Sequence, residues 1–253
     1  TSSSGLSWPS TTRAASSPLP RTAGINDQGL TPRGQTRKEG WIRSLFDAIA
    51  PEYNLFNRIA SLGLDRGWRR KAVDSLGLLP GMRVLDLASG TGDLAAECAR
   101  RLIPLGSVVA NDLSLEMLSV GSKRLTRVPA AFWHIRWAAA RAEALPFGDA
   151  CFDAATMGFA LRNVSGLEAA FRELRRVLKP GGRLALLEFG RPRNLFLRLG
   201  HWFWLSFAVP VIGVLTTGRL WPFLYLRRSI LSFMEAEQVL DRLRMAGFKK
   251  VRA

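Results

Sequence analysis

A strand, a glycine-rich turn and a helix succeed one another in the stretch VLDLASGTGDLA (84–95), and this unit constrains the fold more than any other part of the chain. The apolar run before the glycines predicts a buried strand, and the amphipathic run after them predicts a helix. Short apolar runs and amphipathic helices continue to alternate up to about residue 189. Because strands that alternate with helices pair in parallel, the sequence predicts an α/β fold with a doubly wound, mostly parallel sheet of Rossmann-like type.

The individual elements can be placed from the same periodicity. Strands are expected at 82–87, 107–110, 132–138, 152–157 and 183–189. Helices are expected at 41–60 with a break at Pro51, and at 65–76, 93–102, 115–125, 167–178 and 235–246. The last residues, FKKVRA (248–253), read as the beginning of a further strand, so we expect the final edge strand of the sheet to be truncated.

Residues 1–40 differ in composition from the rest of the chain. They are rich in Ser, Thr, Pro and Arg, and their first acidic residue is Asp27. Such a segment buries too little apolar surface to offset its ordering entropy, so we predict a disordered basic tail. An organelle transit peptide and a basic tether to anionic lipid have the same composition and are alternatives. The predicted folded domain is 41–253.

Charge and cysteine content limit the classes of protein to consider. The formal net charge is +16 and the pI is about 11.3, which favours an anionic partner such as nucleic acid, acidic lipid or a phosphorylated substrate. Cys98 and Cys151 form no C-x-x-C pair, and the two histidines, His134 and His201, are far apart in the sequence. We therefore expect a reducing compartment and no metal site.

The segment 189–234 interrupts the strand–helix alternation. It contains no acidic residue and six arginines, and its middle, HWFWLSFAVPVIGVLTTG (201–218), is apolar for about sixteen residues. That length is below the roughly 20 residues of a membrane-spanning helix, and Pro210 and Gly213 interrupt the run. We expect no spanning helix. The segment suits either a membrane interface or a pair of core helices that cover the sheet and line a pocket, and both can hold.

The charges around the glycine turn discriminate between its candidate ligands. The turn fits the loose pattern of a dinucleotide-binding loop, and Asp112, twenty residues after Gly92, ends the next predicted strand, where it can accept hydrogen bonds from a ribose. Asp86 and Asp93 bracket the turn, and a carboxylate at the helix N-terminus opposes a pyrophosphate. A cationic sulfonium and an ammonium suit these carboxylates, so S-adenosylmethionine is favoured over a nicotinamide cofactor.

Several further motifs occur in a characteristic order: PEYNLFN, SLGLDRGWRRKAV, NDLSLEML, AEALPF, FALRNV and RVLKPGGRLALLEF. With the glycine turn, they resemble the ubiquinone/menaquinone biosynthesis C-methyltransferases, a branch of the class I S-adenosylmethionine-dependent methyltransferases. The resemblance extends from about residue 45 to 191, with a weaker echo to 248. It implies methylation of a ring carbon of a prenylated quinol, with S-adenosylhomocysteine as the second product and no metal.

The resemblance also implies a cofactor site. Gly90, Thr91 and Gly92 would hold the methionine part, Asp86 would lie near its ammonium, and Asp112 would bind the ribose hydroxyls. The adenine side would be formed by Met117, Arg141 and Ala142, with Gly158 also lining the site. Two positions depart from the family pattern. Arg141 stands where Asn or Asp is usual, and Gly158 stands where some members have serine.

At the quinol ring, the resemblance implies Arg162, Asn163, Tyr53 and Asn57. Our hypothesis is that Arg162 stabilises the phenolate formed when the ring loses its hydroxyl proton, and that Tyr53 orients the ring. Arg162 paired with an acid and Tyr53 serving only in packing are the structural alternatives. His201, in the apolar segment, is a further candidate for contact with the substrate.

Other functions are compatible with parts of the sequence. A methyltransferase of the same fold could act on another lipid or natural product, and the net charge suggests an RNA-binding protein or RNA methyltransferase. Against nucleic acid, many of the basic residues lie in the tail and the apolar segment, and no separate RNA-binding module is evident.

The expected partners are a lipid-soluble quinol, an anionic membrane surface, and a quinone-biosynthesis complex or a second copy of the chain. The expected location is a quinone-containing membrane inside the cell: the cytoplasmic face in a bacterium, or a mitochondrion or plastid if the tail is a transit peptide.

Overall fold

The computed structural model describes residues 37–127, 134–192 and 194–253. The predicted tail therefore lies outside the described residues except for its last turn. That turn belongs to helix α1 (Arg37–Ile49), so the expected boundary at Trp41 falls inside a helix. Residues before Trp41 belong to the fold because Glu39 is buried: it is only 4 % exposed and forms an ion pair with Arg141.

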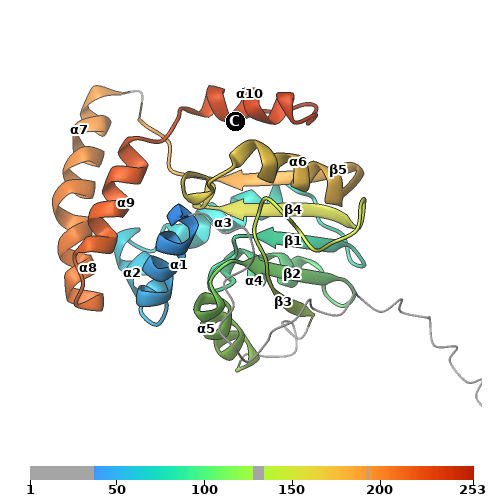
Figure 1. Ribbon diagram of the computed structural model, residues 1–253, viewed down its shortest axis with the longest axis horizontal. Helices are drawn as coiled ribbons and strands as arrows, with labels where there is room; N and C mark the ends of the chain where they lie inside the picture. The colour runs from blue at the N-terminus through green and yellow to red at the C-terminus, as the bar shows by residue number, and fades with distance from the viewer. Residues whose placement is uncertain (1–36, 128–133, 193) are drawn as a thin grey trace, which may run out of the picture. The chain divides into compact units, whose positions relative to one another are not determined.

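One sheet of five strands, in the order β3-β2-β1-β4-β5, forms the centre of the domain, and every pairing is parallel (Figure 1). The strands are β1 (Arg83–Leu87), β2 (Ser107–Asp112), β3 (Ile135–Ala139), β4 (Phe152–Gly158) and β5 (Leu178–Leu187). The chain winds outward from β1 to β3 and then returns to place β4 on the other side of β1. This reversal confirms the predicted doubly wound α/β fold.

Helices cover both faces of the sheet because each presents an apolar stripe to it. One face packs against α3 (Asp65–Asp74), α4 (Asp93–Arg101) and α5 (Leu115–Thr126). The other face packs against α6 (Leu167–Val177) and α10 (Ala236–Met245), where Phe152, Phe171 and Leu243 are buried together. The sequence predicted all of these helices to within a few residues.

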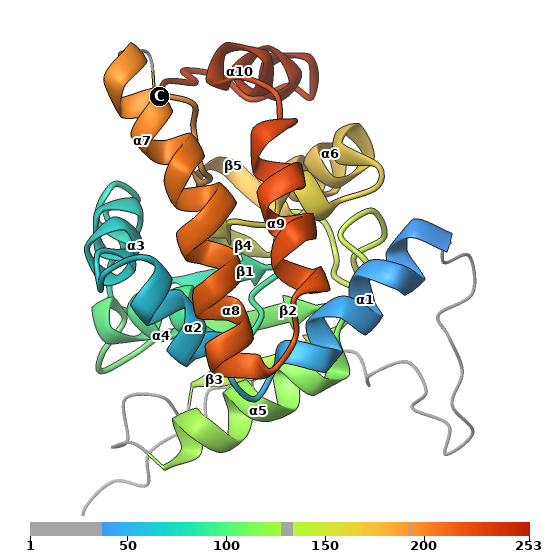
Figure 2. The same ribbon diagram turned by 90° about the vertical axis from the view of Figure 1, so that its left-hand side faces the viewer.

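A third group of helices lies over the carboxyl ends of the strands, as the view onto that end shows (Figure 2). It contains α1, α2 (Tyr53–Ala60), α7 (Leu195–Phe203), α8 (Val209–Thr217) and α9 (Trp221–Leu231). Phe56 of α2 and Phe223 of α9 are packed ring to ring, with Leu205 and Val209 in the same buried cluster. The apolar segment therefore contributes its own small core next to the sheet.

The expectation that Pro210 and Gly213 interrupt the apolar segment is wrong. One helix runs through Leu195–Thr217, joined by a π-helical turn at Trp204–Ala208. This turn ends just before Pro210, and its changed hydrogen-bond spacing accommodates a residue without an N–H inside the continuous helix. With 23 residues, the helix is long and apolar enough to cross a membrane by length and composition, a test that the core helix of a soluble protein also passes.

The strand expected at the C-terminal end does not form. Residues 248–253 are neither helix nor strand. Gly247 ends α10 with a φ of +90°, and Lys250 has a φ of +55°, a left-handed conformation that breaks an extended backbone. Phe248 and Val251 instead pack against the core on the α6 and α10 face.

Replacing Gly213 by Ala is expected to lower the free energy of unfolding by about 1–3 kcal/mol. A Cβ at this position would lie 2.1 Å from the ring of Phe223, so α8 and α9 would have to move apart. Gly200→Ala is the matched control, because a Cβ there meets nothing within 4 Å. It should leave stability unchanged or raise it by up to about 1 kcal/mol through helix propensity. Denaturant unfolding measures both, and equal midpoints for Gly213→Ala and the native chain would contradict the packing argument.

Candidate active site

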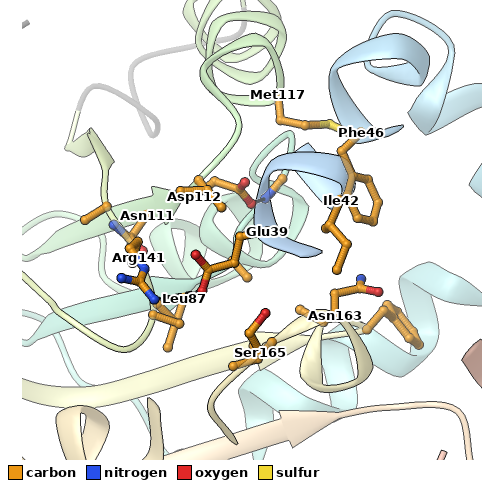
Figure 3. Close-up of a pocket in the computed structure, with 18 of the residues that line it drawn as sticks. Glu39, Ile42, Phe46, Leu87, Asn111, Asp112, Met117, Arg141, Asn163 and Ser165 are labelled. Atoms are coloured by element: carbon orange, nitrogen blue, oxygen red, sulfur yellow. Dashed lines mark hydrogen bonds and ion pairs between the residues drawn. The ribbon is translucent and has the colours of Figure 1, made fainter. Parts of the chain in front are cut away.

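A pocket lies at the carboxyl ends of β1, β2, β3 and β4 (Figure 3). Its empty space, open mouth included, is about 730 Å³. It spans the point at which the strand order reverses, the usual ligand position in an open parallel sheet. Glu39, Ile42 and Phe46 of α1 form the side of the pocket opposite the strand ends.

Asp112 and Gly90 form the middle of the pocket. The two carboxylate oxygens of Asp112 accept backbone hydrogen bonds from Gly90 and Ser114, each at 2.8 Å. These bonds hold the glycine turn against the end of β2. Burial raises the pKa of the Asp112 carboxyl above its ordinary value, although the backbone N–H groups oppose the shift. Gly90 has a φ of +55°, a left-handed conformation that glycine adopts without steric strain.

Thr91 and Gly92, predicted to hold the methionine part of the cofactor, support the turn and do not line the pocket. The buried Thr91 hydroxyl donates a hydrogen bond to Asn54 of α2. A Cβ on Gly92 would lie 2.6 Å from the ring of Trp137, so this glycine allows the turn to pack on β3. The side of the glycine turn that Thr91 and Gly92 form therefore faces the protein interior.

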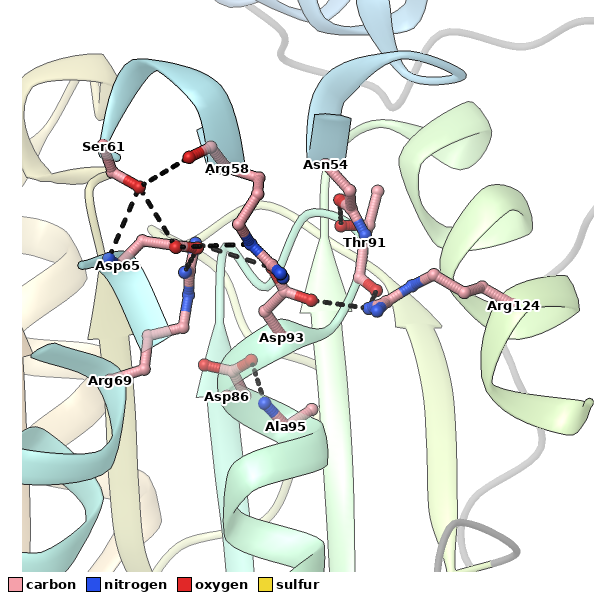
Figure 4. A network of polar contacts seen from close by, with 10 residues as sticks. All are labelled: Asn54, Arg58, Ser61, Asp65, Arg69, Asp86, Thr91, Asp93, Ala95 and Arg124. Carbon is pink, nitrogen blue, oxygen red and sulfur yellow. Dashed lines mark hydrogen bonds and ion pairs between the residues drawn. The ribbon is translucent and has the colours of Figure 1, made fainter. Parts of the chain in front are cut away.

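Asp86 and Asp93 stand where predicted, near the end of β1 and at the first residue of α4, but neither lines the pocket (Figure 4). Asp86 is fully buried and accepts hydrogen bonds from the Ala95 amide at 2.9 Å and the Thr156 hydroxyl at 2.7 Å. Burial raises its pKa to about 7. It therefore anchors the start of α4, and it does not line the pocket as the predicted partner of an ammonium would.

Asp93 is neutralised by arginines on two sides. Arg124 donates to one of its oxygens at 2.7 Å, and Arg69 lies 3.5 Å from the other. Arg69 is also paired with Asp65, which in turn lies 3.7 Å from Arg58 of α2 (Figure 4). This chain of charges ties α2 and α3 to the start of α4. Its function is to hold the helices over the glycine turn.

Negative charge at the pocket still favours S-adenosylmethionine over a pyrophosphate, but residues other than Asp86 and Asp93 supply it. The side chains that line the pocket include three carboxylates, on Glu39, Asp112 and Glu143, and one cation, on Arg141. A diphosphate would face this negative excess, whereas a sulfonium and an ammonium are attracted to it. Met117 and Ala142, which were predicted on the adenine side, line the pocket, as does Asn111, whose buried Oδ1 has no hydrogen-bond partner among the described residues. These features fit S-adenosylmethionine.

Tyr53 and Asn163, predicted at the quinol ring, line the pocket, and so does Gly158, predicted at the cofactor site. Asn163 accepts a hydrogen bond from the hydroxyl of Tyr225 at 3.0 Å. Tyr53 lies beside the glycine turn, because a Cβ on Gly90 would be 3.8 Å from its ring. Burial raises the pKa of Tyr53, against the effects of a hydrogen bond with Asn57 and the charge of Arg69.

Arg162 does not line the pocket. It belongs to a 3-10 turn (Leu161–Asn163) and pairs with Glu188 at 2.5 Å, with side chains 6 % and 11 % exposed. The structural alternative, a pair with an acid, is therefore the arrangement observed. Its charge still acts at the pocket, because it opposes the burial-driven rise in the pKa of both Tyr53 and Tyr225.

Two further predicted residues lie outside the pocket lining. Asn57 is on α2 and interacts with Tyr53, so it acts on the pocket through that ring. His201 is on α7, away from the lining residues, and burial lowers its pKa. Within the described residues, no group of three or more His, Cys, Asp or Glu side chains could hold a metal ion.

The sequence reasoning missed Glu39, Ile42 and Phe46. Their spacing of three and four residues places them on one face of α1, which is the signal of a helix that faces a pocket. Glu39 was assigned to the predicted tail, so this face was not recognised. Tyr225, on α9, was missed because nothing in its sequence surroundings distinguishes it from the apolar segment.

This sheet order, with a carboxylate-lined pocket at the strand ends, is that of the class I S-adenosylmethionine-dependent methyltransferase fold. Solved structures of the same fold include such an enzyme from Aquifex aeolicus, with a TM-score of 0.54 and 20 % identity over 73 % of this chain and 81 % of that one. Another, from Thermotoga maritima, has a TM-score of 0.54 and 23 % identity over 82 % and 81 %.

The sequence comparisons are more specific than the structural ones. A model of the ubiE/COQ5 methyltransferase family matches residues 34–253, and the chain belongs to this family. Two bacterial proteins named ubiquinone/menaquinone biosynthesis C-methyltransferase are close relatives. The protein from Hahella chejuensis is 38 % identical over 84 % of this chain and 85 % of its own length. The protein from Geotalea daltonii is 40 % identical over 85 % and 90 %. The predicted family, enzyme class and cofactor are thereby confirmed.

Proposed function

We propose that the protein transfers a methyl group from S-adenosylmethionine to a ring carbon of a prenylated quinol in quinone biosynthesis. The observation that carries this is that the Tyr53 ring lies beside the glycine turn and that Asn163 lines the same pocket. An aromatic ring and a neutral amide suit a flat phenolic ring with hydroxyl groups. The names of the family's relatives support the same substrate class.

The residues of this chain would contribute mainly by positioning and by charge. The cofactor supplies an electrophilic methyl group on its sulfonium. Tyr53 would hold the quinol ring beside the glycine turn, and Asn163, oriented by Tyr225, would bond a ring hydroxyl. Loss of the hydroxyl proton makes the neighbouring ring carbon electron-rich. Arg162 would favour the resulting phenolate through its charge, from behind Asn163 and without contact.

The substrate assignment can be tested in cells. A bacterial strain lacking its quinone C-methyltransferase accumulates demethylated quinones, and expression of this chain should restore the methylated product, as measured by mass spectrometry. Separate analysis of benzoquinones and naphthoquinones shows which ring is accepted. Methylation of another lipid with no change in either quinone would overturn the proposal in favour of the other natural-product substrate considered above.

We also propose that helix Leu195–Thr217 lies in the plane of a membrane. One side of it, including Leu205 and Val209, is buried against α2 and α9. Outside this buried strip, and around the whole of its first part, the helix exposes apolar residues that are each at least 41 % accessible: Leu195, Phe196, Leu197, Leu199, Trp202, Phe203, Phe207, Val211, Val214 and Leu215. The absence of acids from 189–234 and its six arginines suit the anionic surface of a bilayer. Its second half, from Leu205 on, is packed on the domain, so the helix is expected to lie along the membrane surface and not to cross it.

Replacing Phe196 and Leu215 together by Ser should weaken binding to vesicles that contain anionic lipid by at least about tenfold, because each side chain contributes about 1.5–3 kcal/mol when buried. Both are at least 80 % exposed, so the fold should not change. Met245→Ser is the matched control, since Met245 is 85 % exposed on α10, outside this face. Vesicle co-sedimentation measures the effect. Equal binding by the double variant and the control would contradict docking through this face.

The two protein partners expected from the sequence, a quinone-biosynthesis complex and a second copy of the chain, stay predictions.

A further inference from the structure

Glu39 and Arg141 form an ion pair at one end of the pocket, as Figure 3 shows. Arg141 Nη2 donates to Glu39 Oε1 at 2.8 Å, and Arg141 Nε lies 3.8 Å from Glu143 Oε2. Glu39 comes from the first turn of α1, whereas Arg141 follows β3. The two side chains therefore join the helix that borders the pocket to the far edge of the sheet.

The order of the strands shows which part of the cofactor would meet this pair. The glycine turn after β1 and Asp112 after β2 are proposed to hold the methionine and ribose parts. The purine then extends toward the end of β3, where Arg141 and Ala142 line the pocket. Ile42, Phe46 and Met117 supply apolar surface for its flat faces. This inference rests on that proposed placement.

The hydrogen-bonding pattern of the pair is complementary to adenine. The outer edge of adenine carries an amino donor next to a ring-nitrogen acceptor. A carboxylate has about four lone-pair positions, so Glu39 can accept from a ligand while it accepts from Arg141. We propose that Glu39 accepts a hydrogen bond from the adenine amino group and that Arg141 is the positioning residue that holds this carboxylate. The pair thus selects adenine over a purine that carries a 6-oxo group, which presents an acceptor where adenine presents a donor.

The test compares two ligands by isothermal titration calorimetry: S-adenosylhomocysteine and its deaminated analogue, S-inosylhomocysteine. The native chain should prefer the adenosyl ligand. Glu39→Gln should weaken binding of that ligand about tenfold, the value of one hydrogen bond to a charged group, without weakening binding of the analogue, to which the new amide can donate. The preference should therefore shrink at least tenfold. Glu116→Gln, an exposed position on α5, is the control and should change neither affinity.

Two outcomes separate this inference from the proposals on which it rests. If Glu39→Gln weakens both ligands equally, Glu39 only holds α1 in place, and its role in selecting adenine is overturned. If the native chain fails to bind S-adenosylhomocysteine, the placement of the cofactor itself is overturned. Arg141→Met should reduce the preference as Glu39→Gln does, and Arg141→Lys should restore part of it, whereas a purely structural role would change both affinities in parallel. Thermal unfolding checks that each variant is folded.

Discussion

Asp112→Asn is expected to weaken the binding of S-adenosylhomocysteine by at least about a hundredfold. Two ribose hydroxyls bonded to a carboxylate contribute about 1.5–3 kcal/mol each. The substitution also disturbs the turn, because the amide nitrogen of Asn would face a backbone N–H of Gly90 or Ser114, which now donate to the carboxylate. Calorimetric titration measures the loss. Asp149→Asn, with a 77 % exposed side chain paired to Arg176, is the control and should leave the affinity unchanged.

The same residue predicts how binding depends on pH. The pKa of Asp112 is raised by burial, so its carboxylate takes up a proton at a higher pH than an ordinary aspartate does. The affinity for S-adenosylhomocysteine should therefore be full above this raised pKa and should decline as the pH falls through it. An affinity within about threefold of native for Asp112→Asn, in 0.15 M salt, would show that the ribose is held elsewhere.

The sheet could be predicted because its strands and helices differ in period and are separated by Gly, Pro and polar residues. Parallel pairing then followed from the alternation, and the position of Asp112 followed from the end of β2. The contribution of α1 could not be predicted in the same way. The first turn of α1 is polar, and it is ordered by Glu39, whose partner Arg141 lies 102 residues away. The local composition therefore predicted a tail, whereas in the structure this turn is held by an ion pair between residues far apart in the sequence.

The directions in which side chains point were the second feature that could not be predicted from the sequence. Asp86 and Asp93 flank the glycine turn in the sequence, yet one is buried under α4 and the other is paired with Arg69 and Arg124. The favourable negative charge comes from Glu39, Asp112 and Glu143, two of which lie far from the turn in sequence. The prediction of the cofactor is confirmed by the family, whereas the two carboxylates on which the sequence argument relied do not line the pocket.

Neighbouring residues of one motif can also face opposite ways. Asn163 lines the pocket, and Arg162, beside it in the 3-10 turn, is directed to Glu188. A sequence motif suggests one function for both residues. Only the packed structure shows which of them lines the pocket and which lies behind it. His201 was a candidate because it was one of two histidines, which carries no information about its direction. The structure places it on α7, outside the pocket lining, and its contact with the substrate stays a prediction.

The pair formed by Arg162 and Glu188 allows its structural and catalytic roles to be separated. Arg162→Leu leaves the carboxylate of Glu188 buried without its cation, so we expect a loss of about 3–5 kcal/mol in the free energy of unfolding. Glu188→Leu should cost a similar amount, because it leaves the guanidinium unpaired. The double variant buries two apolar side chains instead of two charges, and it should recover most of the lost stability.

Turnover of the double variant then decides between the two roles. If the charge of Arg162 stabilises the phenolate, the double variant should be folded and should bind S-adenosylhomocysteine with native affinity, yet methylate the quinol about a hundredfold or more slowly. Raising the pH should recover part of this rate, because the quinol then loses its proton without help. If turnover returns together with stability, the pair serves only the fold, and the phenolate must be stabilised by Tyr53 and Asn163 alone.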